Sequence, residues 1–435
     1  MLKRPSPILK NRALSLILLS ATLGLTACGA DSKHTNNESN GVANKELQHD
    51  FSISQSSTLQ SLTISNPLNM ARKDELVFID YTKLPAGIRI DKDFVVLDDT
   101  TVLKHEWVER PNSNDKSLVV QVDLHANESK NLAFITLNNG AKASSSSPKA
   151  YAELAVRVGA SLGDDERFKG GQYVQMQSFT LPNDHTIGNK LFKYEGFGWE
   201  SELAAYRYYF DNRGAIDVFA KQKAQLALKK VGLDGGDYHA LAPWGMDVLK
   251  VGASLGLGAV AANTDDGIVK VSQFDASRAK VFNGAVFSGV LLEADAWQVG
   301  NDTYDLNATY RIAGGQRLTE VIAKAGSLDK WATGIVDHSV DTIDSENTIG
   351  KWCYRASFGK QSLNDDNLGL ALFYECRQSK LDNDLNIAVS INASEAHYYF
   401  LAAWEAENKM FSDMQGFVKY LNEVQNNLNN PILVK

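Results

Sequence analysis

The chain has 435 residues, of which 44% are hydrophobic and 22% are charged, and its formal net charge at pH 7 is −8. This composition is ordinary for a globular protein, and the absence of a basic stripe argues against nucleic acid as a partner. After residue 27, no stretch of the sequence is long and apolar enough to span a bilayer.

The first 27 residues have the pattern of a signal peptide. Four basic residues precede an apolar segment, 13–25, that is too short to be a stable bilayer span. The segment ends in Leu25-Thr-Ala-Cys28, which resembles a lipobox, with small residues that fit a peptidase cleft before the cysteine. We expect removal of residues 1–27 and lipidation of Cys28. The alternative is an ordinary secretory signal with an incidental cysteine.

Residues 28–48 are polar and are expected to form a lipid-anchored flexible tether. Gly29 rather than aspartate follows Cys28, which in a Gram-negative bacterium favours the outer membrane. We therefore expect a lipoprotein of the bacterial cell envelope that faces either the periplasm or the exterior.

Strand patterns dominate the remaining chain. Residues 50–141 contain β-branched and aromatic runs separated by turn residues, which predicts an N-terminal antiparallel β unit. A polar connector at 142–149 marks the best candidate boundary. Residues 150–432 continue with many short strands, and they contain no internal repeat.

Helical patterns are scarce. Residues 222–231 suit a short helix, and apolar residues at steps of three and four over 411–428 predict an amphipathic C-terminal helix. The fold class predicted is all-β, as a large antiparallel β-sandwich with a short C-terminal helix. A propeller is the alternative, which the missing repeat disfavours.

Two cysteines remain after Cys28. Cys353 and Cys376 lie in two strand-like runs joined by a loop rich in Asn and Asp, which predicts a hairpin whose outer ends are tied by a disulfide. Two buried free thiols are the alternative. Neither a CxxC nor an HxxxH spacing is present, which argues against a metal site.

Residues with binding chemistry concentrate in two regions, 184–213 and 237–252. Aromatic faces can stack on the apolar side of a sugar ring, while carboxylates and arginine bind hydroxyl and acidic groups. This mixture therefore favours a carbohydrate ligand. The residues expected to contact it are Trp244, Asp247, Lys250, Trp199, Tyr206, Asp184 and His185.

These regions carry a specific resemblance. The strings are Gly198-Trp-Glu-Ser, Ala205-Tyr-Arg, Trp244-Gly-Met-Asp-Val-Leu-Lys-Val-Gly, Gly315-Gln-Arg and Tyr399-Phe-Leu-Ala-Ala-Trp-Glu. With them the chain resembles, over roughly 55–430, the family catalogued as domain of unknown function 4861. Ala242-Pro243 before the tryptophan and the cysteine pair depart from the family pattern.

The resemblance implies secreted or lipid-anchored proteins of polysaccharide-degrading bacteria with a fold similar to the galactose mutarotase supersandwich. It also implies breakdown of uronate-containing glycans, with dehydration of a terminal uronic acid as the activity. Such an elimination needs a neutralised carboxylate, a base for the adjacent C–H proton and an acid for the leaving oxygen.

The catalytic candidates follow from those three needs. Arg207 suits the carboxylate, because its fork binds carboxylates with two hydrogen bonds. His239, in a glycine-rich loop, suits the base. Tyr206, Tyr208 or Tyr238 can supply the acid, and Glu200 can orient a base or replace it.

Each candidate has a purely structural alternative. Arg207 can pair with Glu202 or Asp217, and His239 can be a surface histidine. Tyr206 and Tyr208 share one strand face, where aromatics usually belong to the core. Trp244 can be a packing residue, and Asp247 and Lys250 can simply pair with each other.

The function predicted is a carbohydrate-active lyase, an oligosaccharide dehydratase, with a uronate-containing oligosaccharide as partner and the membrane contacted only through the lipid. No cofactor and no metal are expected, although Asp184, His185 and Asp247 can hold a metal. The alternatives are a glycoside hydrolase or epimerase, with Glu195 and Glu200 flanking the bond. A non-catalytic glycan-binding lipoprotein, with a stacking surface of tryptophans at 199, 244 and 297, is a further alternative.

Overall fold

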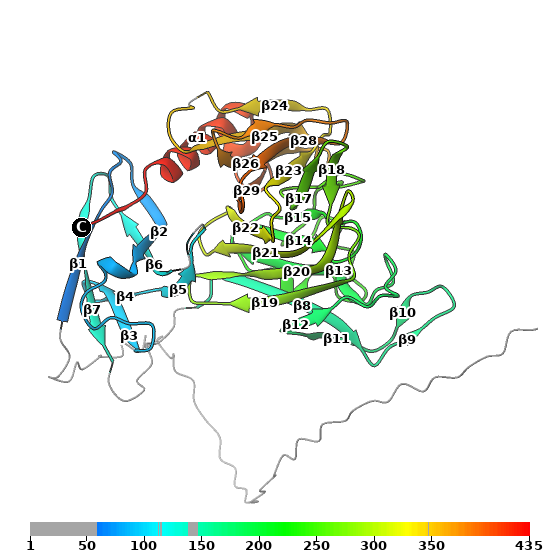
Figure 1. The fold of residues 1–435 in the computed structure, drawn as a ribbon, viewed down its shortest axis with the longest axis horizontal. Helices are drawn as coiled ribbons and strands as arrows, with labels where there is room; N and C mark the ends of the chain where they lie inside the picture. Colours follow the sequence, from blue (N-terminus) through cyan, green and yellow to red (C-terminus); the bar gives the residue numbers. More distant parts are fainter. Residues whose placement is uncertain (1–58, 112, 114, 138–146, 347) are drawn as a thin grey trace, which may run out of the picture. The chain divides into compact units, whose positions relative to one another are not determined.

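In the computed structural model the described residues are 59–111, 113, 115–137, 147–346 and 348–435. Residues 1–58, and with them the predicted signal peptide, Cys28 and the tether, lie outside the described residues, as does most of the connector at 142–149. The described chain is mostly β, and its paired strands run antiparallel (Figure 1). No helix in this part of the chain is long and apolar enough to cross a membrane.

Two small sheets contain the first strands. The five-stranded sheet has the spatial order β30 (Leu433–Val434), β1 (Leu59–Ser65), β7 (Ser129–Thr136), β3 (Phe94–Asp98) and β4 (Thr101–Leu103). The three-stranded sheet has the order β2 (Arg72–Asp80), β6 (Lys116–Leu124) and β5 (His105–Glu109), and a 3-10 turn, η1 (Tyr81–Lys83), follows β2. Alternate apolar residues of both sheets, such as Ile64, Ile79 and Phe134, share one hydrophobic cluster.

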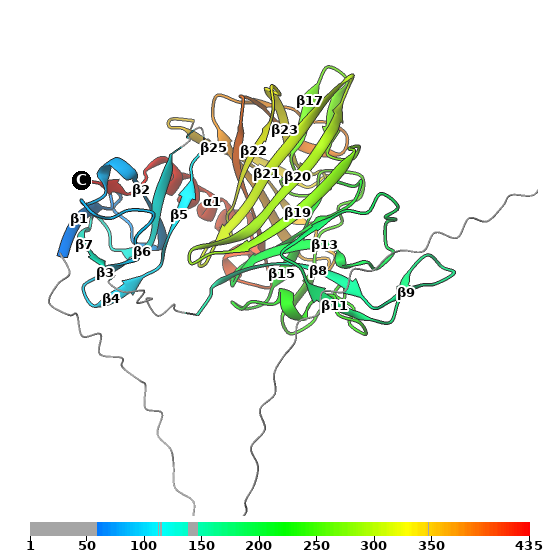
Figure 2. The same ribbon diagram turned by 60° about the horizontal axis from the view of Figure 1, so that its bottom comes forward.

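Three larger sheets form the main body. The six-stranded sheet has the order β11 (Gln172–Gln175), β8 (Ala150–Val158), β13 (Phe192–Ser201), β14 (Ala205–Tyr209), β15 (Ile216–Lys221) and β16 (Gly245–Asp247). The nine-stranded sheet has the order β12 (Ser178–Thr180), β19 (Ala276–Asn283), β20 (Phe287–Val299), β21 (Asp302–Ala313), β22 (Thr319–Ala325), β29 (Ala396–Trp404), β26 (Asn367–Glu375), β25 (Trp352–Lys360) and β24 (Asp341–Asp344). The five-stranded sheet has the order β18 (Gly267–Lys270), β17 (Ala261–Thr264), β23 (Lys330–Val336), β28 (Asn386–Asn392) and β27 (Ser379–Lys380). Figure 2 shows the long strands β19 to β22 side by side.

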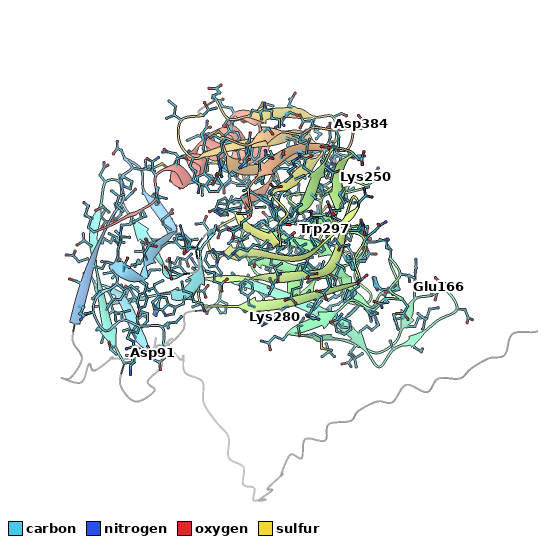
Figure 3. All side chains as sticks on the ribbon, viewed as in Figure 1. Asp91, Glu166, Lys250, Lys280, Trp297 and Asp384 are labelled. Carbon is cyan, nitrogen blue, oxygen red and sulfur yellow. A yellow bond between two sulfur atoms is a disulfide. The ribbon has the colours of Figure 1, made fainter. Side chains whose placement is uncertain are left out.

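One large core joins these three sheets. It includes Trp199 from the six-stranded sheet, Trp297 from the nine-stranded sheet and Trp331 from the five-stranded sheet, all fully buried. Figure 3 labels Trp297 among the strands of the body. The predicted all-β sandwich is confirmed, and the propeller alternative is excluded because the strands form broad stacked sheets rather than separate blades.

The small sheets contact the main body through side chains. Gln121 on β6 donates a hydrogen bond to the carbonyl of Gly314 at 2.7 Å, and Val108 and Val119 share a hydrophobic cluster with Phe287. The described residues between 59 and 435 belong to one compact unit. The division into units at 50–141 and 150–432 stays a prediction.

The predicted C-terminal helix is confirmed as α1 (Met414–Asn429). The side chain of Asp413 caps it by accepting a hydrogen bond from the amide of Gly416 at 2.8 Å. The helix starts three residues later than predicted because a 3-10 turn, η3 (Lys409–Ser412), comes before it. Its apolar face, with Phe417 and Leu421, packs on the strands β25, β26 and β29.

The predicted helix over 222–231 is largely wrong. The structure has only a 3-10 turn there, η2 (Leu228–Lys230). Elsewhere in the chain, β9 (Ser161–Leu162) and β10 (Phe168–Lys169) pair as a short separate hairpin. The carboxylate of Glu200 accepts hydrogen bonds from the amides of Ala227 and Leu228, so a side chain on the sheet fixes this backbone instead of helical hydrogen bonds.

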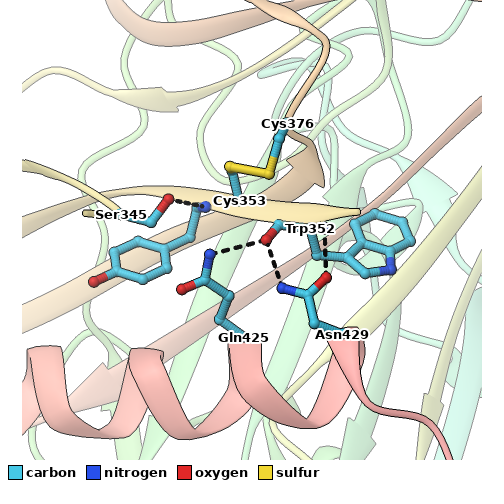
Figure 4. Close-up of a disulfide and its surroundings, with 7 residues drawn as sticks. Ser345, Trp352, Cys353, Cys376, Gln425 and Asn429 are labelled. Atoms are coloured by element: carbon cyan, nitrogen blue, oxygen red, sulfur yellow. Dashed lines mark hydrogen bonds between the residues drawn. A yellow bond between two sulfur atoms is a disulfide. The ribbon is translucent and has the colours of Figure 1, made fainter. Parts of the chain in front are cut away.

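The predicted hairpin and its disulfide are confirmed. Strands β25 and β26 pair along their length, and Cys353 bonds to Cys376 at the end opposite the connecting loop (Figure 4). Beside the bridge, Gln425 and Asn429 of α1 donate hydrogen bonds to the carbonyl of Trp352. The bridge therefore lies where the hairpin meets the helix.

Removing this bridge is expected to destabilise the fold. The two cysteines are separated by 23 positions. For a loop of that size the variant Cys353→Ala/Cys376→Ala should lose about 2–4 kcal/mol of the free energy of unfolding, because the unfolded chain regains conformations that the bridge forbids. Urea unfolding of the oxidised protein and the variant measures the difference, with the reduced protein as the control. Identical unfolding curves for all three would contradict a stabilising role.

Candidate active site

The candidate site lies on the outer face of the six-stranded sheet. Side chains alternate along β14, so that Tyr206 and Tyr208 point into the large core, while Arg207 points to the opposite face. The register places Arg207 between Gly198 on β13 and Asp217 on β15. Residues 222–244, here called the covering segment, connect β15 to β16, and its apolar side chains share a cluster with residues of this outer face. This face is therefore buried although it carries charges.

Arg207 is the centre of a buried polar network. Its Nε and Nη2 donate to Oδ2 of Asp217 at 3.1 and 2.6 Å, and Nη2 also donates to Oδ2 of Asp247 at 2.7 Å and to the hydroxyl of Tyr209 at 2.7 Å. Its Nη1 donates to the carbonyl of Tyr194 at 3.2 Å and to the hydroxyl of Tyr238 at 3.1 Å. The guanidinium has no donor left for a substrate carboxylate. The predicted role of Arg207 as the partner of that carboxylate therefore has no free donor behind it in this structure, and it stays a prediction.

One arginine thus serves two buried carboxylates. Burial and, next, the negative charge of Asp217 raise the pKa of Asp247 well above its usual value. Oδ1 of Asp247 is buried and receives no hydrogen bond from a described residue. Asp247 therefore holds a proton more readily than an exposed aspartate.

His239 connects this network to the surface. Its side chain is 55% exposed, and its Nε2 lies 3.5 Å from Oδ2 of Asp247. Its Nδ1 lies 3.3 Å from Oδ1 of the exposed Asp237, and its ring lies 4.4 Å from the ring of Tyr238. The structure thus brings together three residues predicted from the sequence, His239, Asp247 and Arg207, together with Tyr238.

A pocket of about 270 Å³ lies beside the network. Tyr194 and Tyr238 belong to both the network and the pocket wall. The wall also contains Arg167, Tyr173, Gly188, Lys190, Phe192, Glu195 and residues 232–236. Arg167 and Lys190 are exposed, and neither forms an ion pair with a described residue. The two carboxylates of the wall, Glu195 and Asp234, are paired with Arg213 and Arg157.

The pocket wall contains strained backbone. Strand β13 has an irregular register between Phe192 and Phe197, and within this bulge Tyr194 and Glu195 have φ angles of 42° and 65°. Such values are rare for residues with a side chain, and they are often found at functional sites. The hydroxyl of Tyr194 donates to Oε1 of Glu153 at 2.6 Å. A Cβ atom at Gly198 would lie 2.9 Å from that hydroxyl, which explains the glycine between Glu153 and Arg207.

Four other predicted site residues are core or anchoring residues. Tyr206, Tyr208 and Trp199 are at most 2% exposed in the large core, so they have no surface to offer a substrate. Glu200 is fully buried, and its carboxylate pairs with Lys221 at 2.6 Å and accepts from the amide of Leu228 at 3.0 Å. Glu200 therefore anchors the covering segment, and its predicted catalytic role stays a prediction.

The other predicted contacts are scattered. Trp244 is partly buried against Phe219, with ring centroids 6.1 Å apart, and Lys250 is exposed (Figure 3). Asp247 pairs with Arg207 rather than with Lys250. Asp184 is exposed, and Nδ1 of His185 is hydrogen-bonded to Asn189 at 3.1 Å.

The described residues contain no group of three or more His, Cys, Asp or Glu that could hold a metal ion, so the grouping of Asp184, His185 and Asp247 as ligands is wrong for this structure. The stacking surface of three tryptophans is also wrong, because Trp199 and Trp297 are fully buried.

Several pocket residues were not predicted from the sequence. Tyr194, Arg167 and Lys190 come from a bulge and two loops, and isolated basic residues in loops carry no distinguishing pattern. The run of Tyr194-Glu-Gly-Phe-Gly was the available signal, because glycines within a strand indicate a bulge or a close backbone approach.

A match to a family model shows which protein family the chain belongs to. The model described as "Domain of unknown function (DUF4861)" matches residues 64–434. The chain belongs to this family. The match confirms the resemblance drawn from the sequence strings, and it includes both the network and the pocket of this DUF4861 member.

The chain was also compared with curated proteins and with solved structures. No curated protein matches this DUF4861 chain. Two solved structures from Enterococcus faecalis are similar to it: a protein in glycosyl hydrolase family 38, at 10% identity, and an alpha-mannosidase from strain V583, at 9% identity. Each has a TM-score of 0.42 and 87% of this chain covered, whereas 47% and 46% of their own chains are covered. The chain thus spans less than half the length of these structures.

Proposed function

We propose that this protein is a lipid-anchored carbon–oxygen lyase that removes water from the terminal uronic acid of oligosaccharides. The observation that carries the proposal is His239, a half-exposed histidine held against the buried Asp247–Arg207 pair beside a pocket lined by the cations Arg167 and Lys190. A base, a proton donor and a cationic wall are the groups that an elimination next to a carboxylate needs.

The pocket size supports attack at a chain end. Its volume of about 270 Å³ is slightly below the roughly 300–1,000 Å³ typical of small-molecule sites. One sugar ring rather than a stretch of polysaccharide suits such a space. The cations Arg167 and Lys190 then provide the positive potential that makes the C–H bond next to the carboxylate more acidic.

In the proposed reaction His239 takes the proton from C5 of the uronate. The electrons of that C–H bond form the C4–C5 double bond as the C4–O bond breaks. Tyr238 gives its hydroxyl proton to the leaving oxygen, which departs as water. Burial raises the pKa of Tyr238, so the phenol keeps its proton until the leaving oxygen takes it.

Arg207 acts on this reaction as a positioning residue. Its Nη1 donates to the hydroxyl of Tyr238 at 3.1 Å, which stabilises the phenolate that forms when the proton leaves. Through Asp247 the same network orients His239. Transfer of the proton from His239 back to Tyr238 through solvent restores the starting state.

The hydrolase alternative has less support. It needs two carboxylates that flank one glycosidic bond. Glu200 is buried against Lys221, and Glu195 pairs with Arg213 at 2.7 Å. Of this pair, only Glu195 lines the pocket.

The experiment is incubation of the purified protein with uronate-terminated oligosaccharides, followed by ultraviolet absorbance and mass spectrometry. A new absorbance from the double bond conjugated to the carboxylate, with loss of one water and no chain shortening, is the expected result. Absorbance with chain cleavage would instead mean a chain-cleaving lyase, and shorter products without absorbance would mean a hydrolase. Saturable binding with no product of any kind would overturn the enzyme proposal in favour of a glycan-binding protein.

A further inference from the structure

Arg157, at the end of β8, is held in place by the fold on three sides. Its Nε donates to the carbonyl of Lys190 at 3.1 Å, and its Nη1 donates to the carbonyl of Gly170 at 2.9 Å. Its guanidinium lies 4.1 Å from the centre of the Tyr173 ring. The side chain is only 2% exposed, so its orientation does not depend on solvent.

The fourth side of the guanidinium is occupied by an unusual partner. Asp234 accepts two hydrogen bonds from Arg157, at 2.6 Å from Nη2 and at 2.9 Å from Nη1. Asp234 is nevertheless 64% exposed, and it lies between Gly232 and Gly235, whose φ angles of 71° and 83° are in the region that favours glycine. A buried, oriented fork therefore ends on a carboxylate at the surface.

This ion pair borders the candidate site. Asp234 lines the pocket of about 270 Å³, together with Arg167 and Lys190. Two hydrogen bonds from one arginine fork are the geometry by which arginine recognises a ligand carboxylate. Asp234 thus stands between a carboxylate that enters the pocket and the guanidinium of Arg157.

We propose that Arg157 is the carboxylate-recognition residue of the pocket, and that Asp234 is an internal carboxylate that an acidic sugar displaces when it binds. The choice of a uronate as the ligand rests on the proposed function. The displacement itself rests on the geometry of the ion pair and on the pocket that Asp234 lines.

The competing explanation is that Asp234 only holds the covering segment in place. The two explanations predict opposite effects of removing Asp234 on the affinity for the ligand. If Asp234 competes with the ligand, its removal leaves Arg157 oriented by Lys190 and Gly170, with its charge open to the pocket. If Asp234 only holds the segment, its removal loosens the pocket wall and weakens binding.

The experiment measures binding of sodium glucuronate and sodium galacturonate, with glucose and galactose as neutral probes, by NMR titration of the purified protein. Asp234→Asn should tighten uronate binding by about 2- to 5-fold, the effect of removing one exposed competing charge. Arg157→Gln should weaken it by about 10- to 100-fold, because hydrogen bonds to a charged ligand are lost. Binding of the neutral sugars should not change in either variant.

The matched control is Asp91→Asn. Asp91 also accepts two hydrogen bonds from one arginine, Arg89, and is 53% exposed, but its pair lies before β3 in the small sheets. The Asp91→Asn variant should bind uronate as tightly as the wild-type protein does. Thermal unfolding checks that each variant is folded, and if Arg157→Gln is not, Arg157→Lys replaces it and should still lose affinity because lysine lacks the fork.

Weaker uronate binding by Asp234→Asn than by the wild-type protein would overturn the inference, and so would no uronate binding by either protein. Because binding is measured without turnover, the expected binding pattern with no elimination would remove the proposed lyase activity and leave the inference intact. Elimination activity with unchanged uronate binding in Asp234→Asn and Arg157→Lys would overturn the inference and leave the proposed lyase activity intact.

Discussion

Replacing His239 by alanine is expected to lower kcat for uronate dehydration by about 10²- to 10⁴-fold, the usual contribution of a positioned general base. The imidazole is half-exposed and lies against the buried Asp247 and against the ring of Tyr238, which lines the pocket. Because its side chain makes few packing contacts, the thermal stability of the variant should match that of the wild-type protein. Initial rates from the absorbance of the unsaturated product measure the effect.

The matched control is His125→Ala. His125 is also exposed, but it lies just after β6 in the small sheets and away from the pocket wall. It should keep full activity. A His239→Ala variant with activity close to that of His125→Ala would contradict the role of His239 as the base.

Replacing Arg207 by methionine is expected to lower the free energy of unfolding by about 3–5 kcal/mol, the usual cost of removing one partner of a buried ion pair. Arg207 is 2% exposed and Asp217 and Asp247 are each 1% exposed, so the two buried carboxyl groups would lose the cation that they share. Chemical denaturation at neutral pH measures the loss.

The control here is Arg278→Met, which removes an arginine that is 47% exposed and pairs with Glu293 at 3.0 Å. Its cost should stay below about 1 kcal/mol, because exposed pairs contribute little. Adding Asp217→Asn and Asp247→Asn to Arg207→Met should recover part of the stability, since the penalty comes from unpaired charge. Equal losses in Arg207→Met and Arg278→Met would show that the network is solvated.

The sequence was sufficient for the elements whose pattern is local. Alternation and turn residues located most strands, the steps of three and four located α1, and the two cysteines at the ends of two strand-like runs indicated their bridge. The family strings located the region of the site, because they include Arg207 and Asp247.

The sequence was insufficient where burial depends on distant chain. Period-two alternation separates Tyr206 and Tyr208 from Arg207, but it does not tell which face a second layer covers. Here both faces are covered, one by the large core and one by the covering segment. The carboxylate of Glu200 therefore lies under the covering segment, where it holds a backbone turn. The bulge at Tyr194 and Glu195 shifted the register of β13. Alternation before the bulge therefore does not predict which sheet face the side chains after it occupy.

The pairing of β30 with β1 has a consequence for how the chain folds. Ile64 lies opposite Val434, and Ile432 packs in the hydrophobic cluster of the small sheets. The sheet that contains the first described strand thus gains its outer strand only when residues 433–434 are available. A nascent chain that emerges from its N-terminus cannot finish this sheet before those residues are synthesised, and β1 keeps an unpaired edge until then. Folding of the early strands is therefore tied to a segment far along the chain, with the slow kinetics typical of contacts between distant segments.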